Sequence, residues 1–447
     1  MGETEQEGVN VAAMLADAPW SGWQKGVLAL LSLAYLVDGI ANQSLGLAVP
    51  VLMKAWGLPR EAFAPVAAIG LLGLTMGAVG GGVLGDRIGR RPMMVGSVAV
   101  FGVLTFAQGW AGSLHDLLWL RLADGLFIGA MIPNGAALIA EYAPRSQRAV
   151  ALAIGMTFIA VGAMMAGMIG AVVIPAAGWQ GLFHVLGGVA VAVALVLAMG
   201  LPESPIHLAN RPGCHQRLRK IAARCGLTLG EGPIMAGPAT GKPATGRLSL
   251  DTLFADGVGP STIALWIAFF FCLLANYAMF SWVPAMLAAL GFALSLTSLG
   301  MTALSFGGIV GGVASGWMIR EWGSRGTVLG LAAGGIVAAT VTGLVVHGKV
   351  DSLAVIFALL ALIGFFTAGL LNGLYTFSAF IYPDHARGTG VGAAAAAGRV
   401  GAIASSWAGV VALGMGGAGG YFLLIAGALA IAFVAVAMIR HQIPGAA

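Results

Sequence analysis

Long apolar runs separated by short polar breaks dominate the chain. Twelve runs each reach the length of roughly 20 residues that a helix needs to cross about 30 Å of hydrocarbon. They lie near 24–50, 62–84, 93–111, 116–141, 149–174, 180–201, 260–288, 295–318, 326–347, 353–381, 388–414 and 419–439. The pattern predicts an all-α integral membrane protein with twelve transmembrane helices.

A polar stretch rich in Arg, Gly and Pro separates the first six runs from the last six. The predicted organisation is an N-terminal tail at 1–23, a six-helix half at 24–201, a linker at 202–259, a second six-helix half at 260–439 and a C-terminal tail at 440–447. Two six-helix halves joined in this way are typical of transporters that rock about a central site.

The two halves repeat each other. GGGVLGDRIGRRPMMVG after the second run is echoed by GGVASGWMIREWGSRGTVLG after the eighth, with Gly89 and Gly323 234 positions apart. AEYAPRSQRAV after the fourth run is echoed by FIYPDHARGTG after the tenth, with Arg148 and Arg387 239 positions apart. The repeat predicts two pseudo-symmetric halves.

Glycine is abundant, with 70 residues, and it recurs four positions apart in the second and fourth runs. Examples are Gly73, Gly77 and Gly81, and Gly125 and Gly129. Because small residues at this spacing let helices approach closely in lipid, these faces are predicted helix contacts.

Charge sets the orientation. Only 9% of residues are charged, against about 25% in soluble domains. With both termini in the cytoplasm, seventeen Lys and Arg fall on cytoplasmic segments and only Lys54, Arg60 and Lys349 fall outside. The formal net charge of +5 therefore reflects membrane topology, and no nucleic-acid partner is implied.

The sequence predicts no disulfide, metal site or cofactor. Its three cysteines are Cys214, Cys225 and Cys272, and the first two share the basic linker with His215 without forming a motif for metal binding. The acidic start MGETEQEG lacks the basic region of a signal peptide, so the first span is expected to stay in the mature protein. No Gly-Lys-Ser/Thr phosphate loop indicates direct ATP drive.

Several motifs carry a family resemblance. GDRIGRRP at 85–92 resembles the loop signature of the major facilitator superfamily. VDGIANQSLGLAVP (37–50), RLADGLFIGAMIPNGAALIAEYAPRSQR, LPESPIHL (201–208) and IYPDHARGTGVGAAAAAGRVGAI (381–403) look like the aromatic acid:proton symporter family. The resemblance implies the major facilitator fold and proton-coupled carriage of an aromatic acid.

Two positions depart from the family pattern. The resemblance implies a second acid three positions after Asp38, where this chain has Ala41. It also implies Asp-Arg in the second-half loop, where this chain has Arg320 and Glu321. The first departure bears on proton coupling, and the second predicts a weaker or differently paired latch in that half.

Four charged residues within the spans are the candidates for the central chemistry. At about 1.5 Å per helical residue, Asp38 and Arg399 reach similar depths from opposite halves, whereas Arg121 and Asp124 lie nearer the outer surface. Asp38, Asp124 and Arg121 are assigned to proton coupling, and Arg399 to gripping a substrate carboxylate with its planar fork. A static i, i+3 pair of Arg121 with Asp124, a structural Asp38 and a structural Arg399 are the alternatives.

Polar and aromatic residues in the seventh and tenth spans are candidates for lining the substrate site. They are Asn276, Tyr277, Asn372 and Tyr375, and helix packing is the alternative reading for them. His184, after Trp179, is interpreted as an interfacial residue and not as a ligand.

A third group of charges lies on the cytoplasmic loops, too shallow to hold a central substrate. In the superfamily such residues are latches that break when the carrier opens inward, and topology signals are the alternative. The gating candidates are Asp86, Arg87, Arg90, Arg91, Glu141, Arg145, Arg148 and Arg387.

The sequence thus predicts a secondary active transporter that imports an aromatic or related organic acid with protons across a bacterial inner membrane. A monomer in the lipid bilayer is expected, with no enzymatic activity. A proton-coupled exporter of small organic molecules is the alternative, although the fifth span lacks the Gly-Pro pair frequent in exporters. A membrane-embedded enzyme or sensor would need more clustered reactive groups than the spans contain.

Overall fold

A computed structural model describes residues 9–10, 14–15, 17–211, 213–227, 234–235, 254, 259–348, 352–382 and 387–439 of the 447-residue chain. The side chains of 9–10, 234–235, 379–380 and 387–388 are not described. The described part is almost entirely helical. Two short strands, β1 (Val9–Asn10) and β2 (Ile234–Met235), pair in parallel.

The first half comprises five long helices. They are α2 (Gly22–Trp56), α3 (Ala64–Ile88), α4 (Arg90–Gln108), α5 (Leu114–Tyr142) and α6 (Arg148–Gly200), with 3-10 turns η1 (Arg60–Phe63) and η2 (Arg145–Gln147). Two short helices follow, α7 (Pro205–Ala209) and α8 (His215–Arg224). The second half comprises α9 (Gly259–Ala289), α10 (Leu294–Trp322), α11 (Ser324–His347), α12 (Leu353–Ile381) and α13 (Arg387–Met438).

Ten helices of the described chain are long and apolar enough to cross a membrane, and two of them are long enough to do so twice. α6 has 53 residues and α13 has 52, about double the span length. Each is broken by a glycine with positive φ, Gly178 (φ 67°) in α6 and Gly417 (φ 57°) in α13. Glycine adopts that backbone region readily, so each long helix can divide into two spans there. The twelve predicted spans are thereby confirmed.

Equivalent helices of the two halves pack through equivalent close contacts. In the first half, a Cβ on Gly77 would overlap the backbone of Leu126, so α3 and α5 touch main chain to main chain. In the second half, a Cβ on Gly311 would overlap the backbone of Phe365, which brings α10 and α12 together in the same way. The predicted small-residue contacts are therefore present, and they follow the sequence repeat.

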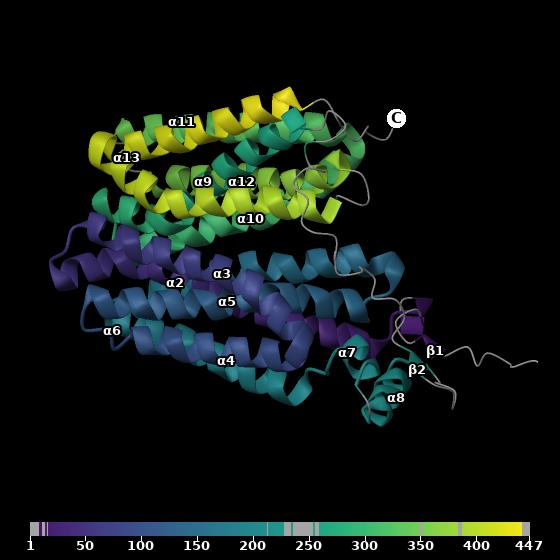
Figure 1. The fold of residues 1–447 in the computed structure, drawn as a ribbon. Helices are drawn as coiled ribbons and strands as arrows, with labels where there is room; N and C mark the ends of the chain where they lie inside the picture. The colour runs from purple at the N-terminus through teal and green to yellow at the C-terminus, as the bar shows by residue number, and fades with distance from the viewer. Residues whose placement is uncertain are drawn as a thin grey trace, which may run out of the picture.

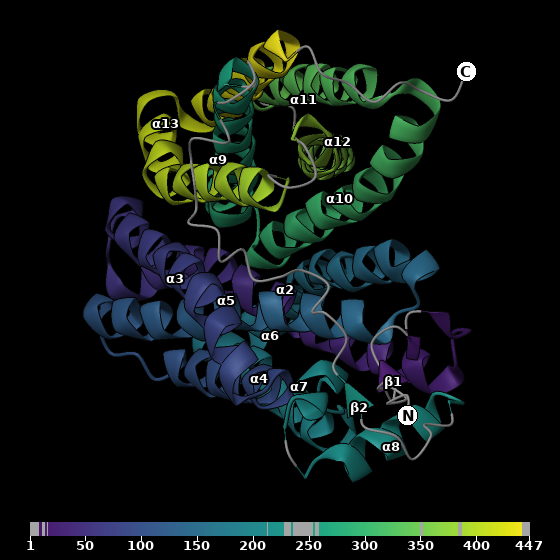
Figure 2. The same ribbon diagram turned by 45° about the vertical axis from the view of Figure 1, so that its right-hand side comes forward.

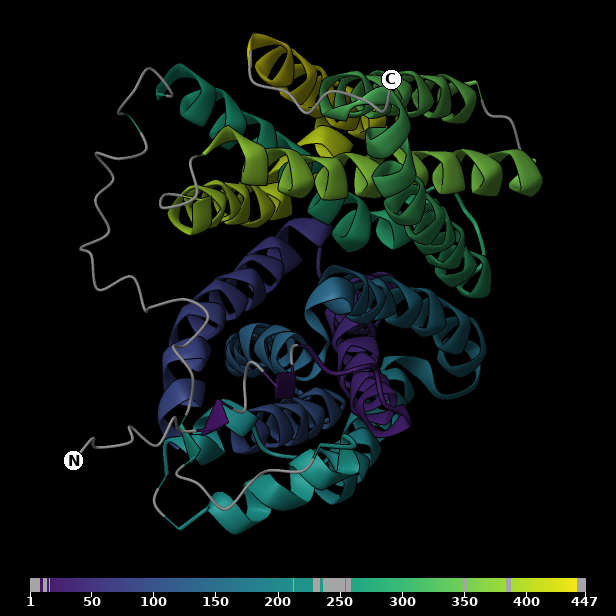
Figure 3. The same cartoon turned by 90° about the vertical axis from the view of Figure 1, so that its right-hand side faces the viewer.

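The two halves form separate bundles, with α2 to α6 in one and α9 to α13 in the other (Figure 1). We call the end where α2 begins the linker end, since α7 and α8 lie there, and the end where α2 finishes and α3 begins the distal end (Figures 1 and 2). Figure 3 looks onto the linker end and shows the bundles side by side.

Contacts between the halves lie toward the distal end. Gln43 Nε2 of α2 donates to the Phe280 carbonyl of α9 at 3.0 Å. Thr302 Oγ1 of α10 donates to the Met164 carbonyl of α6 at 3.3 Å. A Cβ on Gly46 would lie 2.6 Å from the same Phe280 oxygen, so glycine is needed for α2 and α9 to approach this closely.

Candidate substrate and proton site

Asp38 lies in the middle of α2 and is 1% exposed. One turn further on, Asn42 Nδ2 donates to Asp38 Oδ1 at 2.6 Å. One turn earlier, the Tyr35 hydroxyl donates to the Ile132 carbonyl of α5 at 3.0 Å and fixes the rotation of α2. The carboxylate is therefore buried with one side-chain donor from its own helix.

Ala41 occupies the position where the family resemblance implies a second acid. It is buried in an apolar cluster that includes Val37, Leu74 and Ile128. One turn further along α2, the Ser44 hydroxyl donates to the Ala41 carbonyl at 2.7 Å and accepts from Arg121 Nη1 at 3.3 Å. The cation of α5 therefore reaches the segment of α2 that lacks the acid.

Arg121 and Asp124 form the ion pair that their i, i+3 spacing allows. Arg121 Nη1 lies 3.2 Å from Asp124 Oδ2, and Asp124 is 0% exposed. The carboxylate also accepts from Thr105 Oγ1 at 3.2 Å and from Gln108 Nε2 at 3.0 Å, both in α4. A buried charge needs such partners, and this network joins α2, α4 and α5 within one half.

Arg399 of α13 approaches the same region from the other half. Its charge is close enough to interact with Asp38 and with Tyr375 of α12, and Tyr375 in turn interacts with Tyr277 of α9. Arg399 Nη1 is buried and has no hydrogen-bond partner among the described residues. A buried guanidinium donor without a partner is costly, so this nitrogen is available to bind a further group.

Asp38 and Asp124 also interact electrostatically with each other. Asp38 therefore has one neighbouring acid in its own half and one neighbouring cation across the interface between the halves. Two acids and two arginines, from both halves, thus interact with one another inside the membrane spans.

The candidate lining residues divide into two groups. Tyr375, 37% exposed, packs edge-on against Phe269 at 5.0 Å between ring centroids and lies near Arg399. Asn276 is buried in α9, while Asn372 is exposed on α12 with its amide beside Gly312. Within the described residues, no hydrogen bond joins Asn276 or Asn372 to Arg399. Of the four candidates, Tyr375 interacts with Arg399, and Tyr277 interacts with Tyr375.

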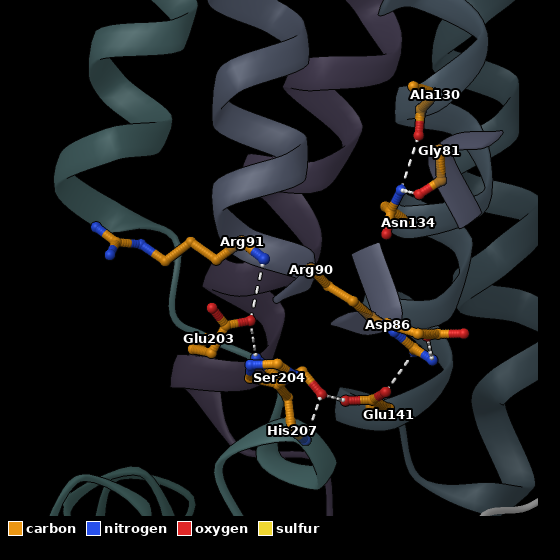
Figure 4. A network of polar contacts seen from close by, with 10 residues as sticks. All are labelled: Gly81, Asp86, Arg90, Arg91, Ala130, Asn134, Glu141, Glu203, Ser204 and His207. Carbon is orange, nitrogen blue, oxygen red and sulfur yellow. Dashed lines mark hydrogen bonds and ion pairs between the residues drawn. The ribbon is translucent and has the colours of Figure 1, made fainter. Parts of the chain in front are cut away.

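A second polar network lies at the linker end of the first half (Figure 4). Arg90 of α4 forms ion pairs with Glu141 of α5 and, at 3.2 Å, with Asp86 of α3. Ser204 Oγ donates to Glu141 Oε2 and accepts from the His207 backbone N–H at 3.0 Å. The ends of three spans are thereby joined to the segment that enters α7.

Glu203 adds a further connection between α4 and this segment. It accepts from the backbone N–H groups of Arg91 at 3.0 Å and Ser204 at 2.9 Å. The Tyr142 hydroxyl donates to the Glu203 carbonyl at 2.6 Å, and Gln24 Nε2 of α2 donates to the Tyr142 carbonyl at 2.9 Å. Every partner in this chain of contacts belongs to the first half or to the first residues of the linker.

The remaining gating candidates are less connected. Arg87 and Arg145 are exposed, and the Nε of Arg148 is buried without a described partner. Arg387 begins α13, but its side chain lies outside the described residues. In the second-half echo, Arg320 pairs with its neighbour Glu321 at 2.8 Å, which is a different pairing from that of Asp86 with Arg90.

Sequence reasoning missed several residues of both networks. Thr105 and Gln108 are spaced i, i+3 in an otherwise apolar span, which is a signal for a polar face. Glu203 and Ser204 stand in the LPESPIHL motif, which resembles the family pattern but indicates no role for either residue.

The described residues contain no group of three His, Cys, Asp or Glu side chains that could hold a metal ion. In the linker, burial raises the pKa of the Cys225 thiol to about 11. That thiol therefore stays protonated at neutral pH and is a poor metal ligand.

Comparison with known proteins identifies the family. Residues 31–349 match the model of the Major Facilitator Superfamily. The 4-hydroxybenzoate transporter of Pseudomonas putida is 30% identical over 409 residues, covering 91% of this chain and 90% of the relative. The gallate transporter of Pseudomonas putida is 31% identical over 413 residues, with 91% and 90% coverage.

Solved structures support the fold independently. The inward-open xylose transporter of Escherichia coli superposes with a TM-score of 0.73 at 17% identity, covering 94% of this chain and 97% of that one. An inward-facing bacterial homologue of the lysosomal transporter Spinster gives a TM-score of 0.69 at 17% identity, with 93% and 96% coverage. The chain belongs to the Major Facilitator Superfamily and, within it, to the aromatic acid transporters.

Proposed function

We propose that the protein is a proton-coupled symporter that carries an aromatic or related organic acid into the cell across a bacterial inner membrane. The observation that carries this proposal is the buried guanidinium nitrogen of Arg399 near Asp38, which has no hydrogen-bond partner in the part of the chain that the structure describes. The transporters of 4-hydroxybenzoate and gallate among the relatives support an aromatic carboxylate as substrate. One chain supplies every residue of the site, which fits a monomer in the bilayer.

The linker end faces the cytoplasm in this proposal, with both termini and residues 202–259 on that side. Seventeen of the 22 Lys and Arg residues then lie on cytoplasmic segments, as the positive-inside tendency requires. The halves touch toward the distal end, through Gln43 with Phe280 and Thr302 with Met164. We therefore assign this conformation to the inward-facing state of an alternating-access cycle.

Arg399 holds the substrate carboxylate. A guanidinium binds a carboxylate through two parallel N–H···O bonds, and a neighbouring Asp38 tunes how strongly it does so. Tyr375 and Tyr277 supply ring faces and hydroxyl groups for the aromatic part of the substrate. Asn276 and Asn372 lie on the same helices as these tyrosines and complete the wall as α9 and α12 move.

Asp38 and Asp124 carry the coupling protons, with Arg121 as the counter-charge of Asp124. Protonation of Asp38 frees Arg399 for the substrate, which links proton binding to substrate binding. Protonation of Asp124 weakens its pairing with Arg121, and Arg121 already has a second partner in Ser44 of α2. Changes at Asp124 are thereby transmitted to the helix that carries Asp38.

The linker-end charges control the conformational change. In this state Asp86, Arg90 and Glu141 are paired within the first half, and the backbone N–H of Arg91 donates to Glu203 of the linker. Arg87, Arg145 and Arg148 belong to the same loops. We expect these residues, together with Arg387 at the start of α13, to pair across the halves when the linker end closes. The same side chains then stabilise two states through different partners.

The energetics favour symport. An anion that enters a cell with a negative interior is opposed by about 2.3 kcal/mol per 100 mV. One cotransported proton cancels that charge, and a second proton makes the membrane potential drive uptake. Such coupling needs titratable acids close to Arg399, the cation that holds the substrate carboxylate, and Asp38 and Asp124 are the two candidates.

The test is uptake of radiolabelled 4-hydroxybenzoate into cells that express the protein, with and without a protonophore. We expect uphill accumulation that the protonophore abolishes. Higher accumulation with the protonophore would indicate export, and an unchanged level would contradict proton coupling.

Arg399→Lys sharpens the test because it keeps the charge and removes the fork. Loss of one charge-assisted hydrogen bond, about 1.5–3 kcal/mol, raises the KM for uptake at least about tenfold. Arg219→Lys on exposed α8 is the matched control. An unchanged KM in Arg399→Lys would contradict the carboxylate clamp.

A further inference from the structure

A cavity lies at the distal end, away from the buried charges. It has a volume of about 260 Å³ and opens between the outer ends of α2 and α9. It is lined by Pro50, Met53, Lys54, Leu58, Arg60, Ala285, Ala288 and Ala289. None of these residues belongs to the site around Arg399.

The walls of this cavity combine two cations with an otherwise apolar surface. Lys54 and Arg60 are its charged residues, and no acid is among the described residues that line it. Glu61, the next residue after Arg60, has its Oε1 3.8 Å from Arg60 Nε, which is a loose contact. Small-molecule sites typically have this composition, with apolar walls and a few charged groups that fix orientation.

The cavity is separated from Asp38 by the closed contact between the halves. Pro50 lies seven residues beyond Gln43, and Lys54 lies sixteen residues beyond Asp38 on the same helix. At about 1.5 Å per residue, these separations correspond to roughly 10 Å and 24 Å along α2. A molecule in the cavity therefore sits outside the Gln43–Phe280 contact and cannot touch the central site in this conformation.

We propose that this cavity is a capture site for organic carboxylates on the outer face, occupied while the distal end is closed. The carboxylate lies between Lys54 and Arg60, and the apolar body rests on Met53, Leu58 and the alanines of α9. Because α2 and α9 must separate to open the distal end, a molecule held there stands at the entrance when it opens. The proposal rests on the proposed function for the orientation of the chain and the class of substrate.

The experiment measures protection of a single introduced thiol in intact cells. Met53→Cys places a thiol in the cavity wall, and a membrane-impermeant maleimide reaches it from outside. Cys272 is 0% exposed and Cys214 and Cys225 lie in the linker, so the unsubstituted protein is the control for background labelling. The probe is 4-hydroxybenzoate, and 4-hydroxybenzyl alcohol is its uncharged counterpart.

We expect 4-hydroxybenzoate to slow labelling about threefold at twice its dissociation constant, and the alcohol to have no effect. Adding Lys54→Gln and Arg60→Gln abolishes the protection. Adding Glu61→Gln instead strengthens it, since Arg60 then loses its competing carboxylate. Equal protection by acid and alcohol, or protection that survives loss of both cations, would overturn the proposal.

Substrate bound at the central site would also protect the thiol if it changed the conformation, and Arg399→Gln separates the two causes. Protection that persists in Met53→Cys with Arg399→Gln belongs to the outer cavity, whereas protection lost with Arg399 would refute a separate capture site. If no uptake of aromatic acid is found but protection persists, the proposed function fails while the capture site stands.

Discussion

The two ends of the molecule are held together in different ways. At the distal end, α2 meets α9 and α6 meets α10 through glycines and through hydrogen bonds to main-chain carbonyls. At the linker end, Asp86, Arg90 and Glu141 form ion pairs within the first half. The distal end therefore depends on close approach between the halves, while the charges at the linker end keep their partners when the halves are apart.

This difference shows how a carrier can open one side without exposing unpaired charge. Separating charges that are bonded only to each other would leave each of them unpaired at a cost of several kcal/mol in a poorly solvated place. Arg90 avoids that cost because its acids travel with it in the same bundle. A main-chain carbonyl at the distal end, by contrast, loses a partner each time that end opens.

The largest expected effect concerns the buried pair between these two ends. Because Asp124→Asn removes the titratable group, it should lower uphill accumulation of 4-hydroxybenzoate at least about tenfold. Downhill exchange should continue. Accumulation and exchange measured in the same vesicles provide the readout.

A purely structural pair predicts a different result for Asp124→Asn. Arg121 would be left buried without its anion, at about 3–5 kcal/mol, and the amount of folded protein would fall. The double change Arg121→Gln with Asp124→Asn would then restore it. Proton-driven accumulation that survives in the double variant would rule out the coupling role.

Gly46→Ala tests the close approach at the distal end. The added Cβ would lie 2.6 Å from the Phe280 carbonyl oxygen, and overpacking of this kind costs about 1–3 kcal/mol in the closed state only. We expect the outward-open population to rise about tenfold or more, seen as a longer spin-label distance between the distal ends of α4 and α11. Gly26→Ala on the same helix, where a Cβ meets nothing within 4 Å, should leave the distance unchanged.

Gln43→Leu tests the hydrogen bond in the same contact. Pro284 has no N–H to donate to Phe280, four residues earlier, so Gln43 is the donor that satisfies this buried carbonyl. Loss of this bond costs about 1–3 kcal/mol in the closed state. The outward-open population, measured by the same spin-label distance, should therefore rise several-fold.

Thr302→Val is the matched control for Gln43→Leu. The Met164 carbonyl lies inside helical α6, whose residue 168 is a methionine with an N–H, so this carbonyl keeps a helical partner. The shift should therefore be smaller than in Gln43→Leu. Equal shifts in the two variants would show that the Phe280 carbonyl, which lacks a helical N–H partner because of Pro284, contributes no more than a carbonyl that keeps one.

The smallest effect is expected at the linker end. Asp86 is exposed, and an exposed ion pair with Arg90 contributes only about 0–1 kcal/mol. Asp86→Asn should leave equilibrium binding of 4-hydroxybenzoate within about twofold and slow transport by a larger factor, because a gating residue acts on the conformational equilibrium. Binding and transport that fall in proportion would contradict the gating assignment.

The spans and their grouping into halves could be predicted from the sequence, because the membrane fixes the length of each apolar run. The pairing of Arg121 with Asp124 also followed from spacing along one helix. The donors Thr105 and Gln108 did not, since their meeting with Asp124 depends on how α4 is rotated against α5. The bond from Gln43 to Phe280 depends on the approach of two halves whose sequences lie 237 positions apart at that point.

The role of Pro284 has a consequence for how this protein changes over generations. Gly46 and Pro50 of α2 stand 234 positions before Phe280 and Pro284 of α9, the same separation as between Gly89 and Gly323. Each proline leaves one carbonyl of its helix without an N–H partner, and Gln43 binds one of them. Because the acceptor is main chain, the side chain at position 280 is free to drift without loss of the bond. A duplicated ancestral half would thus have passed on a docking point that depends on a proline and a main-chain carbonyl, and that a residue-by-residue comparison of position 280 would overlook.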